Sequence, residues 1–176
     1  MCGRPCSSAR PTSSTSTTAW SPGPPRPACR CRRARVVNSQ VEVVSPAWRW
    51  LGISLVELGE GSATVEMTPA EDMANHAGFV HGGMISALAD SAMGRSLRTL
   101  KPGVARAMSF DLKLSFISPA RVGETLRATG RVVHAGRRTA VGECRVETLE
   151  GRLVATASGT FAITREKGIT EGSNAD

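Results

Sequence analysis

The sequence predicts an α+β fold in which an antiparallel sheet of about six strands wraps around one long helix. Two patterns carry this prediction. From Ile85 to Leu97, apolar and small side chains recur at helical spacing on most faces, as in a helix that is buried on most sides. From Met108 to Ile163, apolar residues alternate with polar ones in runs separated by short links. Such links suit antiparallel strands, because a parallel pair needs a long crossover, and a sheet laid over a helix satisfies both patterns.

Local signals set the order of the elements. Ser45 and Pro46 precede a short helical turn that Gly52 ends. A Gly-Glu-Gly turn at residues 59–61 joins two alternating runs into a hairpin, and residues 71–81 are small and polar enough to form a loop. In chain order, the predicted elements are the helical turn, strands over 53–58 and 62–67, the loop, the long helix stopped by residues 101–103, and strands over 108–116, 126–132, 140–146 and 153–163.

The strand over residues 108–116 shows the alternation most clearly. Its apolar side chains are predicted to share one face of the sheet, with the polar side chains between them on the other face. The apolar set is Met108, Phe110, Leu112, Leu114 and Phe116. We therefore expect a half-buried strand that ends at Ser118 and Pro119.

The first 40 residues differ in composition from the rest of the 176-residue chain. They hold seven of the 22 Lys and Arg residues, no Asp or Glu, four of the five cysteines and six of the ten prolines. Such a segment buries too little apolar surface to offset its ordering entropy. Residues 1–40 are therefore predicted to be a disordered tail, or an over-extended start with the protein beginning near Val36 or Val37. The domain is predicted over residues 41–166 and a flexible end over 167–176.

Charge and hydropathy exclude several classes of protein. The net charge of +7 lies in the tail, because residues from 41 onward hold 15 basic and 15 acidic side chains. The domain therefore lacks the basic surface that nucleic acid needs. No apolar run is long enough for a membrane span or a signal peptide, which predicts a cytoplasmic protein. The tail cysteines lack the spacing of zinc ligands, and nothing in the sequence supports His76 or His134 as metal ligands. Cys144 is expected to face inward on a strand as a small buried hydrophobe, so no metal site is predicted.

Residues 75–90, NHAGFVHGGMISALAD, carry the candidate chemistry. His81, Gly82 and Gly83 stand where the long helix begins. The first N–H groups of a helix have no partners within it, so they can hold a carbonyl oxygen or an oxyanion. Asn75 can donate a second hydrogen bond to the same oxygen. The plainer alternative is that the two glycines only let helix and sheet approach closely.

Asp90 is the one acidic residue inside this apolar helix, two turns from its start. A carboxyl group in such a place is costly to bury unless it is paired or used. It is therefore a candidate catalytic group. The alternative is a structural acid that Ser109 or a backbone N–H caps.

This spacing resembles the hotdog-fold acyl-CoA thioesterases of the phenylacetic-acid-degradation (PaaI) type. In that family an Asn precedes G-x-x-H-G-G and an Asp follows on the same helix, as Asn75, Gly78, His81 to Gly83 and Asp90 do here. The resemblance continues through SFDLKLSFISPARVGE at residues 109–124 and covers about residues 46–164. It implies the hotdog fold and hydrolysis of an acyl-CoA thioester to free acid and coenzyme A, without a metal or other cofactor.

The resemblance also implies roles for individual residues. Gly82 would offer its N–H to the thioester carbonyl, and Asn75 would help to orient the carbonyl or the nucleophile. Asp90 would be the nucleophile or the general base, with Ser109 holding the attacking water or Asp90 itself. The implied substrate-binding residues are His81, Gly83, His134, Gly136, Arg137, Arg138 and Thr139. The two arginines either contact the phosphates of coenzyme A or lie on a solvated turn.

Helix geometry predicts a shared active site. Gly82 and Asp90 are eight residues apart, which at 1.5 Å per residue separates them by about 12 Å along the helix axis. One carbonyl cannot contact both. If two such helices run antiparallel across a two-fold axis, Gly82 of one chain meets Asp90 of the other. We therefore expect at least a dimer, and the resemblance implies that dimers often pair into tetramers.

The resemblance implies, first of all, an acyl-CoA thioesterase. Phe79, Met84, Ile85 and Met108 are available to line a pocket, which favours an apolar aryl or medium-length acyl group. One alternative is a non-catalytic sensor that binds acyl-CoA in the same pocket. A second is a hotdog hydratase or dehydratase, which needs a histidine and an acid facing one substrate carbon, and only His81 could serve there. A third is a nucleic-acid binder that uses the basic tail.

Overall fold

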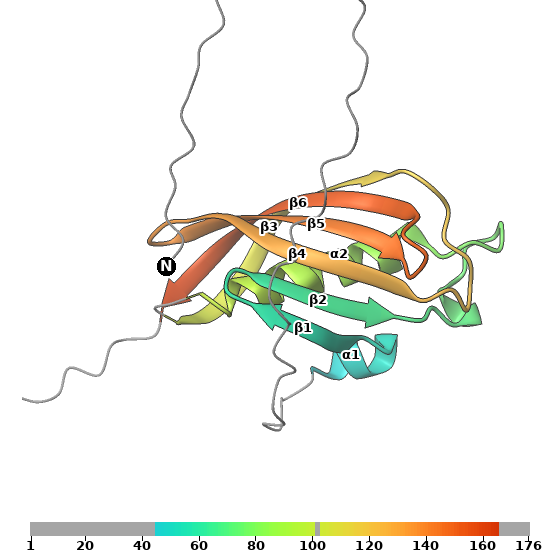
Figure 1. Cartoon of the computed structure of the whole chain (residues 1–176), viewed down its shortest axis with the longest axis horizontal. Coiled ribbons are helices and arrows are strands. Elements are labelled where there is room, and N and C mark those ends of the chain that lie inside the picture. The colour runs from blue at the N-terminus through green and yellow to red at the C-terminus, as the bar shows by residue number, and fades with distance from the viewer. Residues whose placement is uncertain (1–44, 101–102, 166–176) are drawn as a thin grey trace, which may run out of the picture. The chain divides into compact units, whose positions relative to one another are not determined.

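The computed structural model describes residues 45–100 and 103–165 and confirms the predicted fold class. Six antiparallel strands form one sheet that curves around a long helix (Figure 1). The elements are α1 (Pro46–Leu51), β1 (Ser54–Gly59), β2 (Ser62–Met67), the 3-10 turn η1 (Glu71–Met73), α2 (Gly82–Leu97), β3 (Val104–Phe116), β4 (Leu126–Ala135), β5 (Thr139–Thr148) and β6 (Leu153–Arg165). The predicted tail over 1–40 and the predicted end over 167–176 lie outside the described residues.

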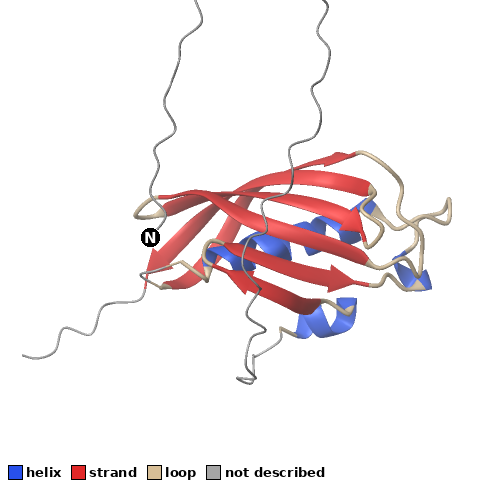
Figure 2. Ribbon diagram, viewed as in Figure 1, coloured by secondary structure: helices blue, strands red, loops and turns tan. Residues whose placement is uncertain are grey.

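The strands follow the order β1-β2-β4-β5-β6-β3, so β1 and β3 are the edge strands of the described sheet. Figure 2 shows this sheet as one layer with α2 running along it and α1 beside β1. The indole Nε1 of Trp48 in α1 donates a hydrogen bond to Ser91 Oγ in α2 at 2.9 Å, which ties the two helices together. Among the described helices, none has the length and hydropathy to cross a membrane.

The core lies between α2 and the sheet. Leu88 and Met93 of α2 are fully buried, as is Phe161 of β6. Gly130 of β4 marks the closest approach of sheet and helix, because a Cβ atom there would lie 2.5 Å from the backbone carbonyl atoms of Ala92. The helix can pack this close only because that position carries no side chain.

The predicted turn signals around α1 and β1 are confirmed. The hydroxyl of Ser45 accepts a hydrogen bond from the Trp48 N–H at 3.2 Å, as an N-cap residue does. Gly52 ends α1 with a positive φ of 66°, and Gly61 has a φ of 68° in the β1–β2 turn. Both glycines occupy the left-handed region that other residues rarely adopt, which explains their places in the sequence.

The long helix ends earlier than the sequence predicts. We expected residues 101–103 to stop it, whereas α2 ends at Leu97. The hydroxyl of Thr99 donates to the Ser96 carbonyl oxygen at 2.7 Å, and the Thr99 N–H donates to the same oxygen at 3.2 Å. These bonds satisfy an end carbonyl of the helix and close it in a tight turn.

The predicted alternation along β3 is wrong at its centre. The pairing with β6 shifts between Ser109 and Asp111, so Phe110 is the extra residue of a β-bulge. A bulge reverses the faces to which the following side chains point. Ser109 pairs with the buried Phe161 and therefore faces α2, whereas Met108 lies on the outer face of the sheet. The apolar set does not share one face.

The expectation that β3 is half-buried is also wrong for the single chain. Met108, Phe110 and Phe116 are 69%, 64% and 57% exposed. No described strand pairs with the outer edge of β3 over its 13 residues. A long apolar edge strand of this kind is unusual in a monomer, because it offers unpaired backbone groups and apolar surface to another chain.

Candidate active site

The backbone N–H of Gly82, at the start of α2, has no acceptor among the described residues. His81 is the N-cap residue, and its Nδ1 atom accepts a hydrogen bond from the Gly83 N–H at 3.0 Å. The Met84 N–H donates to the His81 carbonyl oxygen at 2.9 Å. Within the described residues, the Gly82 N–H has no such acceptor. Of the two glycine amides, the structure thus leaves that of Gly82 to a ligand, at the positive end of the helix dipole.

Gly82 opens onto a pocket of about 360 Å³ with a largely apolar lining. The lining residues are Asn75, Phe79, Val80, Gly82, Ile85, Phe116, Ile117, Ser118, Pro119 and Ala120. The ring of Phe116 lies over Gly82, since a Cβ atom at position 82 would be 2.9 Å from the ring. Asn75 and Gly82, which the sequence analysis grouped together, therefore do lie in one pocket.

The loop that carries Asn75 is held by the side chain of that residue. Its Oδ1 atom accepts hydrogen bonds from the N–H groups of Ala77 at 2.9 Å and Phe79 at 3.2 Å. The Asn75 backbone N–H donates to the Phe79 carbonyl oxygen at 2.7 Å. The side-chain oxygen is therefore used to shape the loop, and the Nδ2 amide is the group that Asn75 can offer to a ligand.

Asp90 lies on the flank of α2 beside β3. Its Oδ1 atom is buried and has no hydrogen-bond partner among the described residues. Burial raises the pKa of the Asp90 carboxyl above its ordinary value, and the hydrogen bond from the Ser109 side chain opposes that shift. Ser109, just before the bulge at Phe110, pairs with the buried Phe161 and so faces the helix, which places this hydroxyl next to the carboxyl.

One chain holds the two halves of the candidate site apart. Asp90 does not line the pocket at Gly82, in agreement with the separation of about 12 Å along the helix. It lies instead beside the open edge of β3, near the exposed Ser109. Within one chain, Gly82 and Asp90 therefore do not share a pocket, and the pairing of Gly82 with Asp90 of a second chain stays a prediction.

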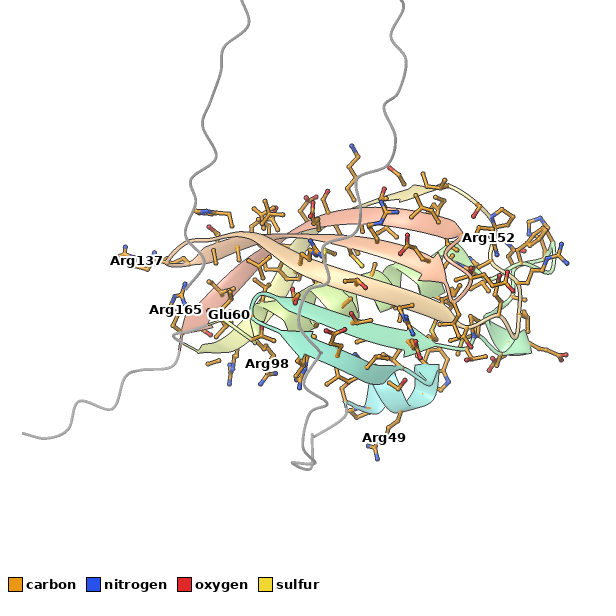
Figure 3. All side chains as sticks on the ribbon, in the orientation of Figure 1. Arg49, Glu60, Arg98, Arg137, Arg152 and Arg165 are labelled. Atoms are coloured by element: carbon orange, nitrogen blue, oxygen red, sulfur yellow. The ribbon has the colours of Figure 1, made fainter. Side chains whose placement is uncertain are left out.

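The predicted coenzyme A residues lie in the β4–β5 turn and at the strand ends beside it. Figure 3 shows Arg137 at one end of the molecule and Arg152 at the other. Arg152 contacts Ser118 and Pro119, which line the pocket at Gly82, so that pocket lies at the end opposite to Arg137. The remaining predicted turn residues are His134, Gly136, Arg138 and Thr139. One chain does not bring them to Gly82.

Sequence reasoning did not assign Phe116 and residues 117–120 to the site. The strand end that leads into Ser118 and Pro119 was the available signal, but only the fold brings it opposite the start of α2. Cys144 is buried as predicted, and burial raises the pKa of its thiol to about 12, so it is a poor nucleophile. The described residues contain no group of three His, Cys, Asp or Glu side chains that could hold a metal ion.

Comparison with known proteins shows the family to which the chain is similar. Residues 77–155 match the thioesterase superfamily. The acyl-coenzyme A thioesterase PaaI of Escherichia coli K12 is 33% identical over 109 residues, which are 62% of this chain and 76% of that protein. The solved structure of the E. coli PaaI protein has a TM-score of 0.64 and 29% identity, and covers 68% of this chain and 85% of its own. The protein smu.793 of Streptococcus mutans UA159, bound to acetyl CoA, has a TM-score of 0.64 and 25% identity over 74% of this chain and 99% of its own.

The chain therefore belongs to the thioesterase superfamily and is a thioester hydrolase with the hotdog fold. Within that superfamily it is of the PaaI type, as the spacing of Asn75, the G-x-x-H-G-G motif and Asp90 predicted.

Proposed function

We propose that this enzyme hydrolyses an acyl-CoA or aryl-acyl-CoA thioester to the free acid and coenzyme A. The observation that carries the proposal is the state of Asp90: a carboxyl on a buried helix, with one oxygen atom buried and without a partner in the described chain. An ionisable group kept in that costly condition is a candidate for chemistry. Water adds to the thioester carbonyl, the C–S bond breaks, and the proton lost by water ends on the thiolate of coenzyme A.

The Gly82 amide polarises the carbonyl in this proposal. Charge develops on the carbonyl oxygen as the nucleophile adds, and an N–H already fixed at the start of a helix stabilises it without reorganisation. His81 supports this role by engaging the Gly83 N–H and thereby setting the first turn of α2. The Nδ2 amide of Asn75 is the second donor in the same pocket.

Asp90 acts as nucleophile or as general base. In either role it must be ionised, and the raised pKa of its carboxyl makes the carboxylate a stronger base than an exposed aspartate. Ser109 holds the carboxylate or the attacking water in place. The choice between the two roles depends on whether a covalent anhydride forms between the acyl group and Asp90.

The proposed active site forms between two chains. The exposed apolar residues of β3, together with its open edge, supply the kind of surface that a second copy covers. Pairing across a two-fold axis brings Gly82 of one copy near Asp90 of the other and creates two equivalent sites. It also brings the β4–β5 turn of one copy closer to the pocket of the other, where Arg137 and Arg138 can meet the phosphates of coenzyme A.

The acyl group is proposed to be apolar. Phe79, Ile85 and Phe116 line the pocket beside Gly82, and the described lining residues include no charged side chain. Met108, which the sequence analysis also assigned to the pocket, lies instead on the outer face of β3.

A thiol-release assay over a panel of acyl-CoA esters tests this function. The panel contains acetyl, medium-chain, long-chain and phenylacetyl esters, and the Asp90→Asn variant is the blank. We expect release of coenzyme A that depends on Asp90 and is fastest with an aryl or medium-chain ester. Binding of the esters without release by the wild-type protein would favour the acyl-CoA sensor instead.

A further inference from the structure

The loop between β3 and β4 forms the wall of the pocket opposite the start of α2. Residues 117–120 line the pocket directly. The Ala120 carbonyl oxygen accepts a hydrogen bond from the Val80 N–H at 3.0 Å, and Phe79 forms a backbone bridge with Arg121. Because these bonds reach the residues just before Gly82, the position of the loop also fixes the entry into α2.

One guanidinium group holds three points of this loop. Arg152, in the β5–β6 turn, donates from Nη1 to Ser118 Oγ at 3.0 Å and to the Pro119 carbonyl oxygen at 2.6 Å. Its Nη2 donates to Glu124 Oε1 at 2.5 Å. The other carboxylate oxygen of Glu124 accepts from the Arg121 N–H at 3.0 Å. The planar fork of an arginine is suited to bridging several acceptors at fixed angles.

Arg152 itself is fixed to the sheet. Its N–H donates to Thr148 Oγ1 at 3.2 Å, and its carbonyl oxygen accepts from the Thr148 N–H at 3.0 Å. Thr148 is buried, and Ser118 in turn donates to the Leu153 carbonyl oxygen at 2.6 Å. The guanidinium therefore projects from a turn that is bonded to the end of β5. It adds a side-chain link between the sheet and the loop to the hydrogen bonds that the Ile117 and Ser118 N–H groups donate to the Val154 carbonyl oxygen at 2.8 and 3.2 Å.

We propose that Arg152 is a positioning residue that holds the loop over residues 117–121 against the start of α2 and thereby sets substrate binding and acyl selectivity. This inference rests on the proposed function of the Gly82 pocket. Arg152 does not line that pocket and acts through Ser118, Pro119 and Glu124. Because the Arg152 and Glu124 side chains are 40% and 26% exposed, their ion pair adds little to stability. The ion pair serves instead to hold the loop in place.

Steady-state kinetics test the proposal with a matched control. Arg152→Gln removes the charge and the fork, while Arg127→Gln breaks another exposed ion pair of the same sheet, that of Arg127 with Glu66. For Arg152→Gln we expect KM to rise about tenfold, the spread of kcat/KM across the acyl-CoA panel to shrink, and kcat on the best ester to stay within about threefold. Arg152→Lys keeps the charge without the fork, so it also shows a raised KM. Arg127→Gln behaves as wild type.

Amide hydrogen exchange gives a readout that does not depend on turnover. The Val80 N–H, bonded to the Ala120 carbonyl oxygen, should exchange at least about tenfold faster in Arg152→Gln than in Arg127→Gln. If the wild-type enzyme released no thiol from any ester, the proposed function would fail, while the Val80 exchange rate would still decide the role of Arg152. KM, selectivity and Val80 exchange equal to those of Arg127→Gln would overturn the proposal. A lower melting temperature with unchanged KM would overturn it as well.

Discussion

At Asp90 the fold keeps a carboxyl group in surroundings that disfavour its charge. The carboxyl has a buried oxygen atom without a partner in the described chain, and its pKa is raised by burial. Asp90→Asn keeps the shape of the side chain but removes the base and the nucleophile. We expect kcat to fall by about a thousandfold or more, with the fold and the affinity for coenzyme A retained. Thiol release and circular dichroism measure the two effects, and near wild-type kcat would show that another group does the chemistry.

The same substitution should stabilise the protein at neutral pH. Burial raises the pKa of this carboxyl in the folded state. The protein is therefore most stable, as far as Asp90 is concerned, below the carboxyl's pKa in the unfolded state, about 3.9, and it loses stability as pH rises through the pKa in the folded state. At pH 7 the ionised Asp90 is therefore a cost that asparagine lacks. Urea unfolding should show Asp90→Asn to be more stable than wild type at pH 7, with the difference vanishing below about pH 4. A variant less stable than wild type at pH 7 would instead identify Asp90 as a structural acid.

Two substitutions at Gly82 test the role of its N–H group separately from the role of the space around it. Gly82→Ala keeps the N–H but brings a methyl group to 2.9 Å from the Phe116 ring, which must shift. Gly82→Pro removes the N–H, and proline suits the first position of a helix when the preceding residue is extended, as His81 is with φ −63° and ψ 135°. We expect kcat/KM to fall about tenfold for alanine and at least a hundredfold for proline. Equal losses would mean that Gly82 serves packing alone.

At the scale of elements, the sequence could predict the features that depend on a few neighbouring residues. Ser45, Gly52 and Gly61 mark turns that depend on a few neighbouring residues, and the order of strands and helices followed from such signals. The bulge at Phe110 has no local signal, because it arises from how β3 pairs with β6, a strand more than forty residues away. It interrupts the alternation, so that Ser109 shares a face of β3 with Leu112 and Leu114.

The packing of α2 on β4 gives a prediction at this scale. Gly130→Ala would place a Cβ atom 2.5 Å from the backbone of Ala92, so helix and sheet must separate. We expect a loss of about 2 kcal/mol or more in the free energy of unfolding. Gly94→Ala, at a position of α2 where a Cβ atom meets nothing within 4 Å, should instead be neutral or stabilising by up to about 1 kcal/mol. Urea unfolding of both variants checks the contrast, and similar midpoints would contradict the close approach.

At the scale of the whole molecule, Asp90 does not line the pocket at Gly82, and we propose that a second copy completes the site. The sequence provides candidate residues for both halves, and their separation along α2 follows from helix rise alone. It could not predict the exposed apolar edge of β3 or the loop that Arg152 holds, because both depend on which segments the fold leaves uncovered or brings together. Met108, Phe110 and Phe116 mark the surface that we propose a second copy covers.

Complementation between two inactive chains tests the shared site most directly. Gly82→Pro and Asp90→Asn chains carrying different tags are co-expressed, and the heterodimer is purified through both tags. One of its two sites then combines an intact Gly82 from one chain with an intact Asp90 from the other, so thiol release should recover to roughly half of the wild-type rate per dimer. A verified heterodimer no more active than either parent homodimer would contradict the shared site and show that each chain acts alone or that one of the two residues has no part in catalysis.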